Sequence, residues 1–221
     1  MKKFRLYILF AFMAALTSGL ASCSETNDEV EEFPNWQATN EQYFDKKYSE
    51  VKQLVDGGNT EWKIIRAWTL EENVATHSYD HILANVLTEG KGSGCPLYTD
   101  SVKVHYSGRL LPSTSYPDGY EFDKSWTGDF YESTAVPRTF AVNAVVTGFS
   151  TALQHMHIGD KWRIYIPQQL GYGELTNPGA AYSTLIFDVE LVAYYRANYS
   201  STAKAPAKDA DAQGRGEWIY Q

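Results

Sequence analysis

The feature that most constrains the fold is a series of strand patterns between about residue 79 and residue 194. Val102, Val104 and Tyr106 alternate with polar neighbours, which is typical of a strand with one buried face. Similar patterns cover residues 82–86, 120–124, 139–142, 161–166 and 185–194. The region therefore favours a sheet of several short strands.

One short helix interrupts these strands. Phe149, Leu153 and Met156 lie at helical spacing, and Gly159 is expected to end the helix. One helix among several strands predicts an α+β domain whose sheet covers that helix.

An N-terminal extension is expected over residues 39–79. Residues 39–56 predict a helix, with Thr39 and Gln42 as a capping box. Its apolar stripe is expected to pack on its own domain, with dimerisation as the alternative. The stripe consists of Phe44, Tyr48, Val51 and Val55. Residues 62–70 then alternate like a strand, for which an added edge strand is one interpretation.

The two ends of the chain carry different signals. Residues 1–22 have the basic start and short apolar run of a signal peptide, and residues 20–23 (Leu-Ala-Ser-Cys) match a bacterial lipobox. We expect acylation at Cys23, with an ordinary secretory signal as the alternative. Residues 23–38 predict an acidic tether, and residues 196–221 predict a flexible tail. The last residues of the tail, 217–220, are apolar enough to dock, although the sequence does not indicate where.

The charge balance limits the partners of this chain. It has 19 basic and 27 acidic residues, and removal of residues 1–22 changes the formal net charge from −8 to −11. An acidic surface argues against binding to nucleic acid, since phosphates attract basic proteins. It also argues against electrostatic attachment to anionic lipid, which leaves the acyl chains at Cys23 as the membrane anchor.

Five short strings occur in one order between residues 102 and 192. They are VHYSG at 104–108, FD at 122–123, VVTGF at 145–149, LGYG at 170–173 and TLIFDVEL at 184–191. None combines a nucleophile with an adjacent base. Aromatic rings and aliphatic walls suit a reaction that needs an apolar, shaped cavity, such as rotation about an X–Pro peptide bond.

Together these strings resemble the FKBP-type peptidyl-prolyl cis-trans isomerases over about residues 80–195. Residues 145–149, followed by Ala152, Leu153 and Met156, are most similar to the Mip-like bacterial branch. The resemblance implies an antiparallel sheet wrapped around a short helix, with the site between them.

The resemblance also implies the site residues. Val146 would offer its backbone N–H to a substrate carbonyl, Phe149 would form the floor, and the Tyr172 hydroxyl would reach the ligand. The other expected members are Tyr106, Phe122, Asp123, Val145 and Phe187. No cofactor or metal is implied. The expected ligands are proline-containing polypeptides and macrolide inhibitors of the FK506 class.

Four departures from the family pattern concern substrate preference more than fold. Phe149 replaces the usual Trp, and Arg138 stands where an aromatic commonly lines the pocket. The loop 177–184 is short, so that Ala181 or Tyr182 would take the place of the family's Ile-Pro-Pro segment. An aromatic-rich insertion covers 126–136.

Three functions follow as hypotheses. The first is a lipid-anchored prolyl isomerase of the bacterial cell envelope, at the outer membrane, acting on exported proteins. The second is a chaperone or binding module of the same fold with weak catalysis, which Arg138 and the short loop motivate. The third is a surface lipoprotein whose pocket binds a glycan or peptide.

Overall fold

The structure is a computed structural model, and it describes residues 31–176, 179–196 and 216–220. The predicted signal peptide, the lipidation site Cys23 and most of the predicted tether lie outside the described residues. No helix in the described part of the chain is long and apolar enough to cross a membrane.

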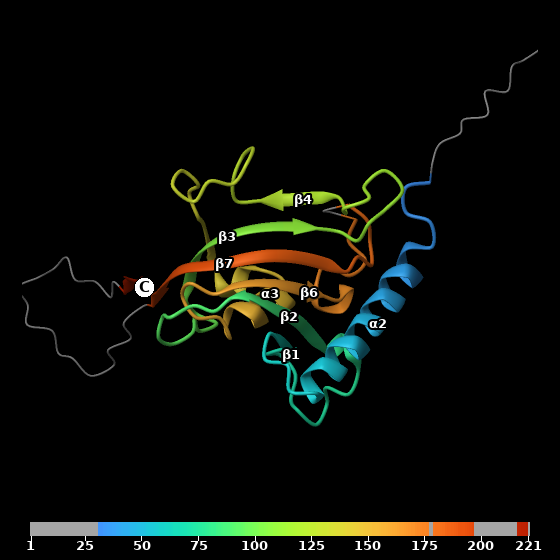
Figure 1. The fold of residues 1–221 in the computed structure, drawn as a ribbon, viewed down its shortest axis with the longest axis horizontal. Helices are drawn as coiled ribbons and strands as arrows, with labels where there is room; N and C mark the ends of the chain where they lie inside the picture. The colour runs from blue at the N-terminus through green and yellow to red at the C-terminus, as the bar shows by residue number, and fades with distance from the viewer. Residues whose placement is uncertain (1–30, 177–178, 197–215, 221) are drawn as a thin grey trace, which may run out of the picture. The chain divides into compact units, whose positions relative to one another are not determined.

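One antiparallel sheet contains the eight strands found in the described residues (Figure 1). The strand order is β1-β2-β6-β7-β3-β4, while β5 also pairs with β3 and β8 pairs with β7. The strands are β1 (Trp62–Arg66), β2 (His81–Thr88), β3 (Ser101–Arg109), β4 (Glu121–Lys124), β5 (Arg138–Ala141), β6 (Lys161–Ile166), β7 (Leu185–Arg196) and β8 (Glu217–Ile219).

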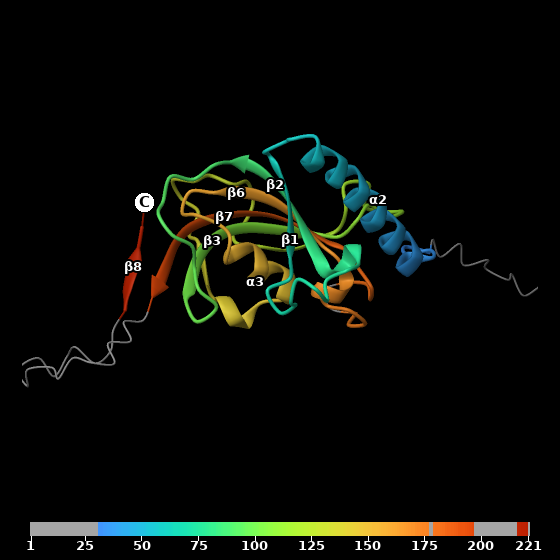
Figure 2. The ribbon, with the colours of Figure 1, turned by 90° about the horizontal axis from the view of Figure 1, so that it is seen from below.

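The sheet curves over the short helix α3 (Thr147–Leu153), as Figure 2 shows. Leu153 and Ile164 are fully buried where helix and sheet pack together. Gly148 allows the close approach, because a Cβ atom there would lie 2.3 Å from Cγ2 of Ile166 on β6. This arrangement confirms the predicted α+β fold with a sheet wrapped around one helix. The helix ends earlier than expected, at Leu153, so that Met156 lies beyond it.

The strands predicted between residues 79 and 194 are found within three residues of their expected ends, whereas the strand predicted over 62–70 ends at Arg66. Val102, Val104 and Tyr106 on β3 are buried, as the alternation predicts. His105 is buried as well, which the alternation did not predict. The insertion at 126–136 explains this difference, because the ring of Phe130 lies 5.2 Å from that of His105 and covers it.

The N-terminal helix α2 (Trp36–Asp56) packs on its own domain. Phe44 and Val51 of the predicted stripe are buried in the same core as the sheet. Lys47 lies over the rings of Trp62 on β1 and Tyr165 on β6. Tyr165 alternates with residues that face α3, so α2 covers the opposite face of the sheet at the β1 edge. The preference for packing over dimerisation and the edge-strand interpretation of β1 agree with this structure.

The beginning of α2 differs from the prediction. The helix starts at Trp36, its N-cap is Asn35, and no side chain caps it. The predicted capping box is wrong, because the Thr39 N–H already donates to the Asn35 carbonyl in the first turn. The helix therefore includes the last three residues of the predicted tether.

The end of the chain returns to the sheet. Strand β8 pairs with the end of β7, and Lys103 lies 4.4 Å from the ring centroid of Trp218. Lys103 also donates a hydrogen bond of 2.6 Å to the Tyr220 hydroxyl. Residues 216–220 are thus ordered against the domain, unlike the flexible tail predicted for 196–221, and the expected docking of the apolar end is found. Residues 197–215 lie outside the described part.

Candidate active site

A pocket of about 200 Å³ opens between α3 and the sheet. Its walls come from β3, β4, β5 and β7, from the segment that leads into α3, and from the loop after β6. All eight predicted site residues line it: Tyr106, Phe122, Asp123, Val145, Val146, Phe149, Tyr172 and Phe187. The structure therefore brings together side chains that are up to 81 residues apart in the chain.

The apolar part of the pocket is a cluster of rings in edge-to-face contact. The ring centroid of Phe187 lies 5.0 Å from that of Phe149 and 5.4 Å from that of Phe122, at interplanar angles of 75° and 89°. Tyr106 contacts Phe149 and Phe140 in the same way, at 6.1 and 5.5 Å. Such pairs add about 0.5–1.5 kcal/mol each beyond the burial of area. The cluster therefore gives the pocket a defined shape.

Gly108 makes room for this cluster. A Cβ atom at Gly108 would lie 2.5 Å from Cε1 of Phe187 and 2.7 Å from Cζ of Phe122. The two rings can occupy these positions only because residue 108 has no side chain. This explains the glycine at the end of the VHYSG string.

A polar group lies at one edge of the pocket. The Tyr106 hydroxyl donates to Asp123 at 2.5 Å, and Nη1 of Arg138 donates to the same hydroxyl at 2.8 Å. Arg138 also contacts both carboxylate oxygens of Asp123 at 3.2 Å. The negative charge of Asp123 is thus paired at the pocket edge, and Arg138 itself does not line the pocket.

The tyrosines of the pocket stay neutral at physiological pH. Burial, together with the hydrogen bond to Asp123, raises the pKa of Tyr106 well above its ordinary value. Burial also raises the pKa of Tyr172, and the charge of Asp123 adds to this shift. Both hydroxyls therefore remain protonated, and each can act as a donor.

Two donors at the pocket have no partner within the described residues. The Val146 N–H, directly before α3, makes no hydrogen bond there, and neither does the Tyr172 hydroxyl. An N–H or O–H donor next to an apolar surface loses free energy unless it finds an acceptor. Both groups can therefore hold a carbonyl oxygen of a bound peptide.

The described part of the short loop, residues 179–184, contributes no side chain to the pocket. Ala181 and Tyr182 do not line it, although the Tyr182 N–H donates to the Gly173 carbonyl at 2.6 Å. Tyr182 has a φ of 61°, a left-handed conformation that is uncommon outside glycine. The loop thus supports the segment that carries Tyr172 through its backbone.

Sequence reasoning missed two lining residues, Phe140 and Ala144. Phe140 lies on a strand that the alternation predicted and is partly buried, but its place in the pocket wall depends on the pairing of β5 with β3. Ala144 lies in a short turn without a periodic signal. Among the described residues, no group of three or more His, Cys, Asp and Glu side chains is arranged to hold a metal ion.

The curved antiparallel sheet, the single covered helix and the ring-lined pocket define a domain of the FKBP class. Residues 95–192 match the family model described as FKBP-type peptidyl-prolyl cis-trans isomerase. These residues form an FKBP-type domain of the Mip-like bacterial branch.

Two curated relatives illustrate the similarity. The chain is 41% identical over 110 residues to the FKBP-type 22 kDa peptidyl-prolyl cis-trans isomerase of Escherichia coli, covering 48% of this chain and 47% of that protein. It is 38% identical over 120 residues to the Macrophage infectivity potentiator of Trypanosoma cruzi, covering 53% and 55%. The chain thus spans about half the length of the curated relatives it matches.

A solved structure, a peptidyl-prolyl cis-trans isomerase from Pseudomonas syringae, matches with 28% identity and a TM-score of 0.46. That match covers 69% of this chain and 94% of the other.

Proposed function

We propose that this protein is a peptidyl-prolyl cis-trans isomerase that acts on proline-containing polypeptides. The observation that carries the proposal is the pocket between α3 and the sheet, in which an apolar ring cluster adjoins two donors that have no partner among the described residues. Its volume of about 200 Å³ is smaller than the roughly 300–1,000 Å³ of typical small-molecule sites, and it suits one proline ring.

The physical basis is the polarity of the amide. Resonance gives the planar peptide bond a rotation barrier of about 18–20 kcal/mol, so that uncatalysed isomerisation of an X–Pro bond takes tens to hundreds of seconds. Twisting the bond removes the resonance and its charge separation, so the twisted amide is less polar and loses less when it leaves water. An apolar pocket consequently binds the transition state better than the ground state, as catalysis requires.

The residues take distinct roles in this proposal. Phe149 and Phe187 form the apolar surface that receives the proline ring. The Val146 N–H and the Tyr172 hydroxyl hold carbonyl oxygens of the client, which orients the rotating bond. Asp123, paired with Arg138, contributes a polar edge without a free charge inside the pocket. Macrolides of the FK506 class would compete for the same pocket.

The test is a protease-free NMR exchange assay on Leu-Pro and Phe-Pro peptides. The parent protein is expected to accelerate exchange, and Phe149→Ala and Asp123→Ala are expected to reduce it. Tyr172→Phe removes one hydrogen bond worth about 0.5–1.5 kcal/mol, so kcat/KM should fall about 2- to 13-fold. Tyr131→Ala, at an exposed aromatic outside the pocket, is the control. A parent protein without activity above background at high concentration would reject the proposal.

We also propose that the protein is attached to the bacterial cell envelope through acyl chains on Cys23. The lipobox supports this, as does the name of a relative in Legionella longbeachae, "Outer membrane protein MIP", which is 32% identical over 114 residues. Metabolic labelling with a palmitate analogue tests it: the parent should incorporate label, and Cys23→Ser should not. Equal labelling of both would contradict lipidation at this residue.

The alternative of a weakly catalytic chaperone or binding module has less support in the geometry. Arg138 was one of the two sequence features that suggested this alternative, but its side chain contacts Asp123 and does not line the pocket. Suppression of aggregation of a proline-free client that persists in Phe149→Ala and Tyr172→Ala would favour this alternative.

A further inference from the structure

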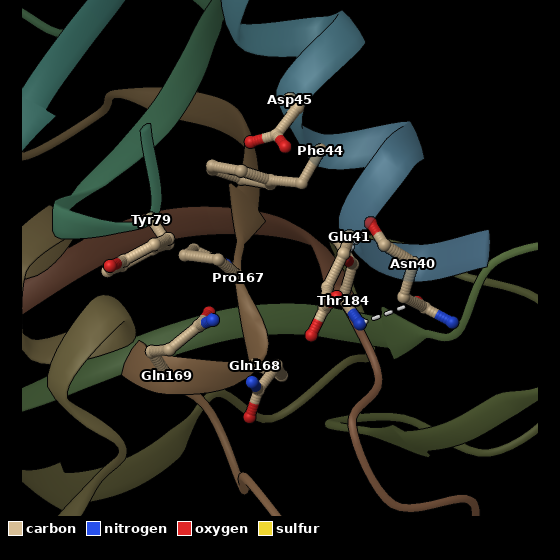
Figure 3. A pocket seen from close by; sticks show the side chains of 9 residues that line it. All are labelled: Asn40, Glu41, Phe44, Asp45, Tyr79, Pro167, Gln168, Gln169 and Thr184. Carbon is tan, nitrogen blue, oxygen red and sulfur yellow. Dashed lines mark hydrogen bonds between the residues drawn. The ribbon is translucent and has the colours of Figure 1, made fainter. Parts of the chain in front are cut away.

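A second pocket, of about 210 Å³, lies where α2 meets the segment after β6 (Figure 3). Glu41 and Asp45 extend from α2, and Gln168 and Gln169 come from the segment across the pocket. The other lining residues are Asn40, Phe44, Tyr79, Pro167 and Thr184. The pocket therefore combines an apolar floor with carboxylate and amide groups.

Buried contacts hold the two sides of this pocket together. The Trp36 Nε1–H donates to Oγ of Ser183 at 2.7 Å, and the Thr184 N–H donates to Oδ1 of Asn40 at 2.7 Å. Asn40 and Thr184 are each 1% exposed, and Phe44 is 2% exposed. Because these groups fix α2 on the domain, the pocket is formed without a ligand.

The carboxylates of this pocket differ in their ion pairing from the other carboxylates described on α2. Asp56 pairs with Lys52 at 2.9 Å and Glu50 pairs with Lys47 at 3.7 Å. Glu41 and Asp45 form no ion pair within the described residues, and they are the only charged residues that line the pocket.

Each of these two carboxylates also has an oxygen available. Glu41 accepts one hydrogen bond, from Gln37, and Asp45 accepts one, from Ser78. The second oxygen of each has no partner in the described part of the chain. Glu41 and Asp45 are neighbours at i, i+4 on the helix, so their like charges repel each other.

The two pockets border one short segment, Pro167–Gly173. Gln168 and Gln169 line the second pocket, and Tyr172 lines the first. The Cα atoms of Gln169 and Tyr172 are three residues apart, which limits their separation to about 10–11 Å. An extended client chain covers this distance in about three residues.

We propose that the second pocket is a subsite for a Lys or Arg side chain of the client whose proline occupies the first pocket. The aliphatic stem packs on Phe44 and Pro167, and the charged group meets Glu41 and Asp45. The acidic chain as a whole attracts such clients over longer distances. This inference rests on the proposed isomerase function and adds a preference for prolines with a basic residue about two to four positions away.

The test compares matched peptides in the NMR exchange assay. Each peptide carries Lys or the uncharged isostere norleucine at one position, two to four residues before or after the proline. Glu41 and Asp45 are exposed, and exposed ion pairs contribute modestly, so we expect the ratio of kcat/KM for Lys over norleucine to be about two to five at the best position, through KM. The ratio should fall to about one in Glu41→Gln/Asp45→Asn and in 1 M NaCl.

Glu50→Gln is the matched control, because Glu50 is an acidic residue on the same helix outside the pocket. It should keep the Lys preference. A ratio of one in the parent at every position, or a preference that survives the double substitution, overturns the subsite.

A parent protein that turns over no peptide rejects the isomerase function instead. The subsite is then decided by binding of a proline-free Lys peptide. Shifts of the Gln168 and Gln169 amide resonances that disappear in the double variant support it, and their absence overturns it.

Discussion

Substitution of Gly108 by alanine is expected to damage both the stability and the pocket of this protein. The new Cβ atom would lie 2.5 and 2.8 Å from two atoms of the Phe187 ring and 2.7 Å from one atom of the Phe122 ring. Phe187 cannot move away freely, because Phe149 lies 5.0 Å from it on another side. One of the two rings, or the strand itself, must therefore shift.

The magnitude follows from two opposing effects. Overpacking a core costs about 1–3 kcal/mol. Replacement of glycine lowers the entropy of the unfolded chain and gains about 0.4–1 kcal/mol where the backbone allows it. Since three contacts fall below 3.0 Å, the steric cost should prevail, and Tm should fall by up to about 10 °C for a domain of this size.

Thermal unfolding and the exchange assay measure the two consequences. Displacement of Phe122 or Phe187 changes the wall of the pocket, so kcat/KM for a Leu-Pro peptide should fall about tenfold or more, equivalent to about 1.4 kcal/mol. Ser107→Ala is the control, since it lies on the same strand with its side chain on the opposite face. Equal stability and activity of the Gly108→Ala and Ser107→Ala proteins would refute the packing argument.

Three further substitutions test other parts of the structure. Asn40→Ala leaves the buried Thr184 N–H without an acceptor and should cost about 1–3 kcal/mol in denaturant unfolding, whereas no loss would mean that α2 is not fixed there. Arg196→Met removes the cation beside the Asp100 carboxylate, which is 2% exposed and keeps a hydrogen bond from the Leu97 N–H, and should cost about 1–3 kcal/mol by the same measurement; unchanged stability would contradict this. Burial raises the pKa of Tyr43 to about 12, so stability should fall as the pH rises from about 10 to 12, where only the unfolded chain ionises. Tyr43→Phe should make this fall shallower, and an unchanged pH profile would argue against the shift.

The strands could be predicted from the sequence because their signal is local. Alternation of apolar residues located β6 at Lys161–Ile166 without error, and it located the beginning of β3 within one residue. The beginning of α2 could not be predicted in this way. Its first residue, Trp36, is fixed by a hydrogen bond to Ser183, which is 147 positions away in the chain.

In the candidate site, too, some features could be predicted from the sequence and others depend on tertiary contacts. Ordered strings identified eight lining residues, since a family pattern encodes which distant positions meet. The partner of Arg138 was not predictable, because the contact with Asp123 depends on β4 and β5 both pairing with β3. Likewise, the burial of His105 depends on an insertion that has no counterpart in the family pattern.

The position of Arg138 has a consequence for the chemistry of the pocket. In the proposed isomerisation, a free carboxylate beside the rotating bond would favour the more polar planar amide and so raise the barrier. Arg138 contacts both oxygens of Asp123 at 3.2 Å, and the Tyr106 hydroxyl occupies one of them. The field of the carboxylate inside the pocket is thereby reduced, while its oxygens still orient the Tyr106 ring. An aromatic residue at position 138 would extend the apolar wall but leave Asp123 unpaired, so in this protein the arginine keeps the pocket apolar through charge pairing.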